Sequence, residues 1–392
     1  MVEEDGPLAR LIAEEIGKGR MTFADFMERA LYHPKLGYYM RERAPGGRAG
    51  DYYTSPDLGR LFGSCLARQF GQMWRLLGRP EPFFLVELGA GRGFLTEDIL
   101  RAVEEDREFF RASRFVLVEM SPARLKEAPQ RLLTSPGRKE KVGFLDCLSG
   151  WESPSEGAAC LFSNELLDAL PVHRVSQKGS HLQEVYVRQE EGRFYEELGE
   201  PSSPELKSYF QNLEVKPPEG GRAEVRLRAI EWMKEVGRKL KRGFVITIDY
   251  GYPAKELYSP LRPQGTLLCY YRHTVHEDPY VRVGRQDITA HVDFTSLVRA
   301  GKEVGLQLTG FTDQLHFLMG LDAPQLVERA SKGDPLRQRL ALKTLLLPGG
   351  LGGTMKVLIQ HKGDFSGSLS GLRSPPFKKK ELEEGNLQAL FG

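Results

Sequence analysis

An acid and three closely spaced glycines follow one short apolar run and give the sequence its clearest chemical signal. The segment FFLVELGAGRG, residues 83–93, places Glu87 shortly before Gly89, Ala90, Gly91 and Gly93. Glycine tolerates a positive φ and lets a ligand touch the main chain. Because like charges repel, the acid is poorly placed for a pyrophosphate and suits a ligand with a cationic end. A tight strand-to-helix turn is the alternative interpretation of the glycines.

Two more acids stand at the ends of the next two apolar runs. RFVLVEMS contains Glu119 and Met120, and VGFLDCL contains Asp146. We expect all three acids at the edge where open α/β sheets bind ligands. A carboxylate at Glu119 can accept hydrogen bonds from both hydroxyls of a ribose. Asp146 can hold an adenine amino group, and a solvated loop acid is the alternative for that residue.

These features together predict a site for S-adenosyl-L-methionine, whose sulfonium and ammonium groups are positively charged. An NAD-dependent oxidoreductase is the disfavoured alternative, because its glycines follow the spacing G-x-G-x-x-G and this chain has G-x-G-x-G. We assign eight residues of the three strand ends to the cofactor: Glu87, Gly89, Ala90, Gly91, Gly93, Glu119, Met120 and Asp146.

Alternating strands and helices must position these residues. Short apolar runs recur along the chain, and helical stretches separate the first of them. This pattern predicts an α/β fold with a seven-stranded, mostly parallel sheet covered by helices. The glycine motif with its acids indicates that the fold is of the class I methyltransferase (Rossmann-like) type. The runs span residues 83–88, 114–118, 142–145, 158–162, 243–248, 306–311 and 355–360. Before them, amphipathic helices are expected over 8–16, from a cap at Thr22 to His33, and over 58–77.

We expect three parts along the chain: an N-terminal helical region (1–80), a methyltransferase domain (81–363) and a disordered tail (364–392). Two insertions, 172–242 and 252–291, interrupt the domain, and the first opens with a strand pair over 172–198. Long irregular segments inside a compact domain are usually functional, so we expect the insertions to build the substrate wall. The tail is rich in Ser, Gly and Pro and has nothing to bury.

A loop of the N-terminal region carries aromatic and hydroxyl side chains directly after Gly50. It suits a flap that closes over a bound cofactor. A simple helix entry, with Ser55 as N-cap, is the alternative. We assign Tyr53, Thr54 and Ser55 to the cofactor, and Asp51 and Tyr52 to the substrate.

Composition and charge exclude several classes of protein. The 392 residues carry a formal net charge of +2, which gives no reason to expect a nucleic acid or an anionic membrane as partner. No apolar stretch approaches the ~20 residues that span a bilayer, so no membrane insertion is expected. The acidic N-terminus lacks the features of a signal or transit peptide, and a cytoplasmic location is expected. The four cysteines lie far apart, and no metal site is predicted.

Six segments, taken in order, resemble one family. They are GDYYTSPDLGRLFG (50–63), VELGAGRG (86–93), SNELLDALPVHRV (163–175), IDYGYP (248–253), QDITAHVDF (286–294) and GGTMKVLIQHKG (352–363). The chain resembles the MidA family of mitochondrial complex I assembly-factor methyltransferases and their bacterial relatives. The resemblance implies S-adenosyl-L-methionine-dependent methylation of a protein arginine, with a respiratory complex I subunit as the partner of the mitochondrial member. A cofactor-binding assembly chaperone without turnover, or a methyltransferase of another substrate, is the alternative. The chain is expected to be a monomer or a homodimer.

The resemblance also implies roles at the fourth strand end. Arginine methyltransferases place an acidic loop there, and this chain has Asn164, Glu165 and Asp168. Paired carboxylates can clamp two nitrogens of a guanidinium. We assign Glu165 as the clamp, Asp168 as its second carboxylate, and Asn164 to the cofactor or the methyl path. The alternative is that the first turn of a helix favours acids.

Three further residues complete the candidate site. Asp249 and Tyr250 follow the apolar run 243–248 and are assigned as another carboxylate and a wall of the substrate tunnel. A strand-end turn is the alternative for this pair. His291, in QDITAHVDF, is assigned as a base or a substrate contact, with a purely structural histidine as the alternative.

Overall fold

The computed structural model describes residues 6–41, 60–329, 335–347 and 351–373. The chain divides into two compact units, each assembled from three segments. Unit 1 contains residues 1–52, 167–232 and 251–297, and unit 2 contains residues 53–166, 233–250 and 298–392. Both expected insertions therefore contribute mainly to unit 1, together with the start of the chain.

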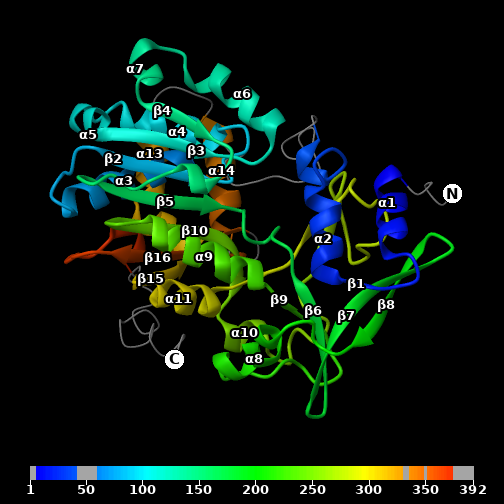
Figure 1. The fold of residues 1–392 in the computed structure, drawn as a ribbon. Coiled ribbons are helices and arrows are strands. Elements are labelled where there is room, and N and C mark those ends of the chain that lie inside the picture. The colour runs from blue at the N-terminus through cyan, green and yellow to red at the C-terminus, as the bar shows by residue number, and fades with distance from the viewer. Residues whose placement is uncertain (1–5, 42–59, 330–334, 348–350, 374–392) are drawn as a thin grey trace. The chain divides into compact units, whose positions relative to one another are not determined.

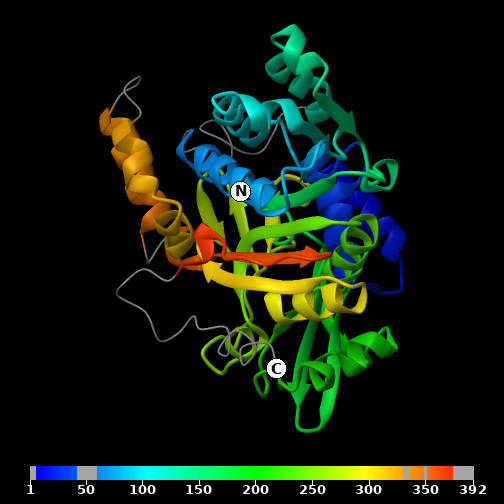
Figure 2. The ribbon, with the colours of Figure 1, turned by 90° about the vertical axis from the view of Figure 1, so that its left-hand side faces the viewer.

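Unit 2 is built on a sheet with the strand order β4-β3-β2-β5-β10-β16-β15 (Figure 1). The strands from β4 to β10 are parallel, and β16 is antiparallel to both of its neighbours. Figure 2 shows β15 and β16 pointing in opposite directions. The bounds are β2 Phe83–Leu88, β3 Ser113–Val118, β4 Val142–Leu145, β5 Ala158–Asn164, β10 Gly243–Tyr252, β15 Gln307–Asp313 and β16 Met355–Lys362. This arrangement confirms the predicted seven-stranded, mostly parallel sheet.

Side chains of alternating residues face opposite sides of this sheet, and both sides are covered. In β16, Val357 and Ile359 belong to the main apolar core, whereas Gln360 lies against Gly301 on the other face. The core joins the sheet to α3 (Leu61–Leu76), α4 (Phe94–Val103), α5 (Arg107–Ala112) and α12 (Gln314–Gly320). The remaining helices of unit 2 are α6 Pro122–Leu132, α7 Pro136–Lys139, α13 Ala323–Arg329, α14 Pro335–Leu346 and α15 Leu351–Thr354. Two helices begin in unit 1 and end in unit 2; they are α9 Leu227–Lys239 and α11 Phe294–Glu303.

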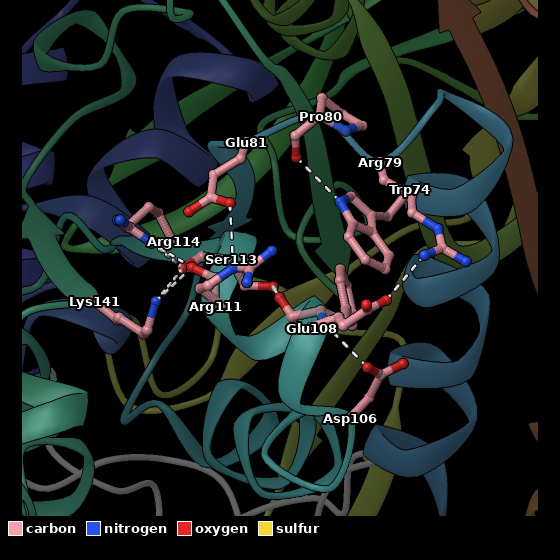
Figure 3. Close-up of polar contacts among 11 residues, drawn as sticks. Trp74, Arg79, Pro80, Glu81, Asp106, Glu108, Arg111, Ser113, Arg114 and Lys141 are labelled. Atoms are coloured by element: carbon pink, nitrogen blue, oxygen red, sulfur yellow. Dashed lines mark hydrogen bonds and ion pairs between the residues drawn. The ribbon is translucent and has the colours of Figure 1, made fainter.

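Polar contacts close the end of this sheet where β2 and β3 begin (Figure 3). Trp74 donates from Nε1 to the carbonyl of Pro80 at 3.0 Å, and Arg79 pairs with Glu108 at 2.9 Å. Lys141 donates to the carbonyl oxygens of Arg111 and Ser113. A shallow groove at this end is lined by Pro82, Phe84, Arg114, Val116, Lys141 and Gly143. These contacts hold the amino ends of β2 and β3. The carboxyl ends of the same strands, where the chemistry is expected, lie at the opposite edge of the sheet.

Part of the expected disordered tail is folded. Residues 364–373 include a short helix, η4 (Ser370–Leu372), whose Gly371 N–H donates to Oε1 of Gln69 at 3.0 Å. Gln72 Oε1 accepts from the N–H of Ser370 at 2.8 Å, and Leu369 is buried. The expectation of a disordered tail from residue 364 was therefore wrong up to residue 373, because two glutamine side chains of α3 supply partners for its backbone. Residues 374–392 lie outside the described residues.

Unit 1 combines the first helices of the chain with two small sheets. The larger sheet has the order β1-β7-β6-β9 with β8 beside β7, and the smaller has the order β12-β11-β13. Its strands are β1 Met21–Thr22, β6 His173–Lys178, β7 His181–Glu190, β8 Arg193–Gly199, β9 Ala223–Val225, β11 Leu268–Tyr271, β12 Thr274–His276, β13 Asp287–Thr289 and β14 Val292–Asp293, which pairs with the end of β10. Its helices are α1 Pro7–Ile16, α2 Phe23–Tyr32, α8 Pro204–Leu213 and α10 Ala254–Leu257.

Two sequence expectations about unit 1 can be compared directly with these elements. The cap at Thr22 is confirmed, because its Oγ1 accepts from the N–H of Asp25 at 3.1 Å. The strand pair expected over 172–198 is instead three strands, since two tight turns allow β7 to pair with both β6 and β8. Among the described residues, no helix has both the length and the apolar character needed to cross a membrane.

Candidate functional site

The glycine loop joins β2 to α4, and its three glycines all have a positive φ. These angles are +71° at Gly89, +56° at Gly91 and +76° at Gly93, a region that other L-residues rarely adopt. A Cβ on Gly89 would lie 2.7 Å from Leu166, and one on Gly93 would lie 3.1 Å from Leu117. A Cβ on Gly91 would meet no heavy atom within 4 Å. Only Gly91 therefore leaves free space that a ligand can fill, while the other two accommodate neighbouring leucines.

Glu119, directly after β3, holds this loop. Its Oε2 accepts from the N–H of Gly91 at 2.7 Å, and its Oε1 accepts from the N–H of Ser121 at 2.8 Å. The side chain is buried. A carboxylate has about four acceptor positions, so each oxygen retains capacity for another donor. The carboxylate thus both shapes the loop and offers acceptors beside the open space at Gly91.

Glu87 is buried inside unit 2, where its Oε2 accepts a hydrogen bond from Oγ1 of Thr96 in α4. Burial raises the pKa of this carboxyl to about 8, and the nearby charge of Glu119 acts in the same direction, while the bond from Thr96 opposes the shift. The group is therefore mainly protonated at neutral pH when nothing positive lies beside it. A nearby cation would favour its ionised form.

The two other strand-end residues assigned to the cofactor are accessible. Asp146 follows β4 and is exposed, and half of the surface of Met120 is open to solvent (50%). Ala90, inside the loop, is buried, and its N–H donates to the carbonyl of Val118 at 3.1 Å. The strand ends β2, β3 and β4 thus carry these side chains along one edge of the sheet.

The end of β5 carries an uncommon backbone conformation. Glu165 has a φ of +51°, although it is not a glycine, and its N–H donates to the carbonyl of Ile248 at 2.9 Å. Asn164 donates from Nδ2 to Oε1 of Glu165 at 3.0 Å. Oδ1 of Asn164 is buried and has no hydrogen-bond partner among the described residues. A strained residue beside an unsatisfied buried acceptor is typical of a functional site.

Asp249 lies next to this turn and supports it from β10. The register pairs Ile248 with Asn164, so Asp249 extends one residue beyond the end of β5. Its side chain is fully buried; Oδ2 accepts from the N–H of Leu166 at 3.1 Å, and Oδ1 accepts from its neighbour, Tyr250. Because Leu166 also packs against Gly89, this carboxylate connects β10, the β5 turn and the glycine loop. Tyr250 is half-buried against the main core.

Asp168 and His291 belong to unit 1, where backbone contacts bring their segments together. The carbonyl of Asp168 accepts from the N–H of Ala290 at 3.1 Å. Burial raises the pKa of the Asp168 carboxyl to about 6, against the opposing charge of Arg226. The His291 ring lies 5.4 Å from that of Tyr252.

Sequence reasoning missed Arg226, a buried arginine that binds both segments, because a single charged residue in a linker has no distinguishing pattern. The five residues assigned to the flap lie outside the described residues; they are Asp51, Tyr52, Tyr53, Thr54 and Ser55.

The donors and acceptors in unit 2 fit S-adenosyl-L-methionine. The ligand is cationic and carries two ribose hydroxyls, both of which need acceptors. Unit 2 offers the buried carboxyls of Glu87 and Glu119, the unsatisfied Oδ1 of Asn164, and bare main chain at Gly91. These groups are acceptors and uncharged backbone, which suit a positively charged ligand.

Comparison with known proteins gives a consistent result. Residues 65–312 match the model of a family described as "Putative S-adenosyl-L-methionine-dependent methyltransferase". The chain is 30% identical over 323 residues to the protein arginine methyltransferase NDUFAF7 homolog, mitochondrial, of Drosophila melanogaster, covering 75% of this chain and 69% of that protein. It is 29% identical to the human protein arginine methyltransferase NDUFAF7, mitochondrial, over 364 residues, covering 85% and 78%.

Solved structures agree with the fold. A Burkholderia thailandensis protein, crystallised with S-adenosyl-homocysteine, superposes with a TM-score of 0.82 and 29% identity, covering 95% of this chain and 98% of that chain. A native crystal structure from the same organism has a TM-score of 0.81 and 30% identity, covering 95% and 97%.

One sequence expectation is contradicted by these relatives. The curated proteins are named as mitochondrial, whereas the sequence led us to expect a cytoplasmic location. That expectation rested on the composition of the first ten residues alone, which carries less weight than a relationship over most of the chain.

Proposed function

This chain belongs to that family of S-adenosyl-L-methionine-dependent methyltransferases, and from this premise we propose that it methylates an arginine side chain of a partner protein. The relatives named above are protein arginine methyltransferases, and the match covers three quarters or more of this chain. We further propose a subunit of respiratory complex I as the partner, in line with the resemblance in sequence.

The observation that carries this proposal is the conformation of Glu165. A left-handed φ costs a non-glycine residue about 1–2 kcal/mol, and a glycine at this position would avoid the cost. The strained turn places a carboxylate at the end of β5, beside the unsatisfied Oδ1 of Asn164 and the Leu166 that covers Gly89. A cationic, hydrogen-donating substrate group fits two adjacent acceptors of this kind.

A guanidinium needs such acceptors because its pKa is above about 12 and no side chain deprotonates it in advance. When bound, S-adenosyl-L-methionine supplies an electrophilic methyl group on a positively charged sulfur. Glu165 accepts hydrogen bonds from the guanidinium and draws its positive charge toward the bound nitrogens. Oδ1 of Asn164 accepts from the substrate or from the cofactor. These contacts hold the reacting nitrogen at a fixed position and keep water out.

The other assigned residues support this chemistry indirectly. Asp249 is fully buried and holds the N–H of Leu166, so we assign it to positioning the Glu165 turn and not to contact with substrate. The cofactor is held by the glycine loop and by four side chains at the strand ends: Glu87, Glu119, Met120 and Asp146. We propose that unit 1, which contains most of both insertions, recognises the protein substrate through the half-buried His291, whereas the buried Asp168 is assigned to positioning.

Two measurements test the proposal. Mass spectrometry of the methyl proteome, with and without this gene, should reveal one or a few arginine sites that lose methylation, on complex I subunits if the partner is right. Glu165→Gln should retain donor affinity and lose methylation of that site, with Glu105→Gln, an exposed glutamate, as the matched control. If no protein arginine depends on the gene while the donor still binds, arginine methylation is ruled out, which leaves a cofactor-binding assembly protein without turnover or a methyltransferase of another substrate.

A further inference from the structure

Arg226 is buried in unit 1 directly after β9, and its guanidinium binds four carbonyl oxygens. Nε donates to Leu170 at 3.0 Å, and Nη1 donates to His291 at 3.1 Å. Nη2 donates to Asp168 at 2.7 Å and to Ala290 at 2.9 Å. The four acceptors belong to two segments more than a hundred residues apart in the sequence, so one side chain joins them.

The strand β9 also helps to hold the backbone N–H of His291. The N–H of His291 donates to Oγ1 of Thr266 at 2.9 Å. Thr266 in turn donates to Oε2 of Glu224, from its N–H at 2.8 Å and from its hydroxyl at 3.2 Å. Glu224 and Arg226 are two residues apart and so lie on the same side of the extended chain. Glu224 therefore holds the N–H of His291 through Thr266, and Arg226 holds the carbonyl of His291 directly.

Burying a cation costs free energy unless hydrogen bonds and opposite charge compensate it. Here four hydrogen bonds go to main-chain carbonyls of the segments that carry Asp168 and His291, and the carboxyl of Asp168 supplies opposite charge. Uncharged side chains could fill the same space, whereas only a guanidinium offers a planar set of five N–H donors that reaches both segments.

We propose that Arg226 is a positioning residue for methyl transfer, which holds the segments 168–170 and 290–291 together and thereby orients Asp168 and His291. The inference rests on the proposed function, because it takes His291 to face the protein substrate. Arg226 itself contacts neither donor nor substrate in this proposal, and it acts through the backbone of the segments that it joins.

The test compares Arg226→Lys with Arg222→Lys in the full-length protein. Lysine keeps the charge and loses the planar fork. Arg222 lies on the same segment, and its guanidinium pairs with the carboxylate of Glu196 at 3.1 Å, which makes it a matched control. Three readouts are taken: donor affinity by calorimetry, hydrogen exchange at Leu170, Ala290 and His291, and tritium transfer from labelled S-adenosyl-L-methionine to protein extract of cells that lack the gene.

For Arg226→Lys we expect donor affinity within about threefold of the wild type, because the glycine loop lies in unit 2. Exchange at the three amides should become faster, and methyl transfer should fall about 10- to 100-fold, the scale of a small misplacement near the chemistry. Arg222→Lys should match the wild type. Equal exchange and equal transfer in the two variants would overturn the inference.

Two further outcomes are separated in advance. If Arg226→Lys does not fold, Thr266→Val removes the link between His291 and Glu224 with a smaller change, and the same loosening and slower transfer are expected. If the wild type transfers no methyl group, the proposed function fails and the catalytic part of the inference fails with it. Hydrogen exchange then still decides whether Arg226 holds the two segments together.

Discussion

The N–H of Gly91 donates to Oε2 of Glu119 at 2.7 Å, so the acid at the end of β3 holds the loop at the end of β2. The same carboxylate accepts from Ser121, which leads into α6. The side chain of Glu119 thus connects the glycine loop to the end of β3. A substitution of Glu119 should change both the conformation of the loop and its affinity for the ligand.

Glu119→Gln should weaken binding of S-adenosyl-L-methionine by about tenfold or more. The amide nitrogen cannot accept a hydrogen bond, so either Gly91 or Ser121 loses its partner, and a buried unpaired donor costs about 1–3 kcal/mol. Isothermal calorimetry gives the affinity, and thermal unfolding gives the stability. Glu105→Gln is the exposed control. Unchanged affinity in Glu119→Gln would remove this residue from the cofactor site.

Gly91→Ala should abolish donor binding with only a modest loss of stability. Its Cβ would enter the open space beside Glu119, and its φ of +56° adds about 1–2 kcal/mol of strain. Gly179→Ala is a control matched in both respects, because Gly179 has a φ of +58° and also faces open space, in the turn between β6 and β7. We expect similar melting temperatures for the two variants and lost donor binding in Gly91→Ala alone.

Glu165→Gly should leave the stability within about 1 kcal/mol of the wild type and abolish methylation. Glycine relieves the left-handed strain, but it also removes the acceptor of Nδ2 of Asn164 and the proposed clamp. Glu191→Gly is the matched control, since Glu191 has a φ of +50° in the turn between β7 and β8 and is exposed. Glu191→Gly should melt at higher temperature and Glu165→Gly close to the wild type, both measured by calorimetric scanning. Retained methylation in Glu165→Gly would argue against a clamp at this position.

Glu87 should make the stability of the ligand-free protein depend on pH. Its folded pKa, about 8, lies above that of an unfolded glutamate, about 4.3, so the folded state binds the extra proton between these values. Its contribution is therefore largest below pH 4 and is lost as pH rises toward 8. Glu87→Gln should flatten this part of the pH profile of the melting temperature. Parallel profiles for variant and wild type would contradict the assignment.

Donor binding should show the opposite trend through the same group. A cation beside Glu87 favours its ionised form, so affinity for S-adenosyl-L-methionine should rise as pH approaches and passes 8. Calorimetry in buffers of different ionisation enthalpy should detect release of a proton on binding near pH 7. Binding without proton release would place the cation of the ligand away from Glu87.

The sheet could be predicted from sequence because each of its strands is a short apolar run between helices. The expected run 83–88 coincides with β2, and 355–360 falls within β16. The acids at the strand ends followed from the same pattern, since parallel strands bring their carboxyl ends to one edge. The helix α8 and the strand β9 were missed, because the proline- and glycine-rich stretch between them resembles a linker.

Other features had no signal in the sequence. The left-handed φ of Glu165 depends on the bond from its N–H to Ile248, which joins residues far apart in the chain. Which glycine faces a ligand depends on Leu166 and Leu117, which fill the space beside two of the three. Arg226 looks like any charged surface residue until its four carbonyl partners are known.

The position of β16 constrains how the protein can form during synthesis. This strand is the last of the sheet to be translated, yet it lies between β10 and β15. Until residue 362 has left the ribosome, β10 presents an open edge and β15 has no neighbour within the sheet. A nascent chain stalled before that point would expose unpaired strand edges of β10 and β15, which can pair with other chains.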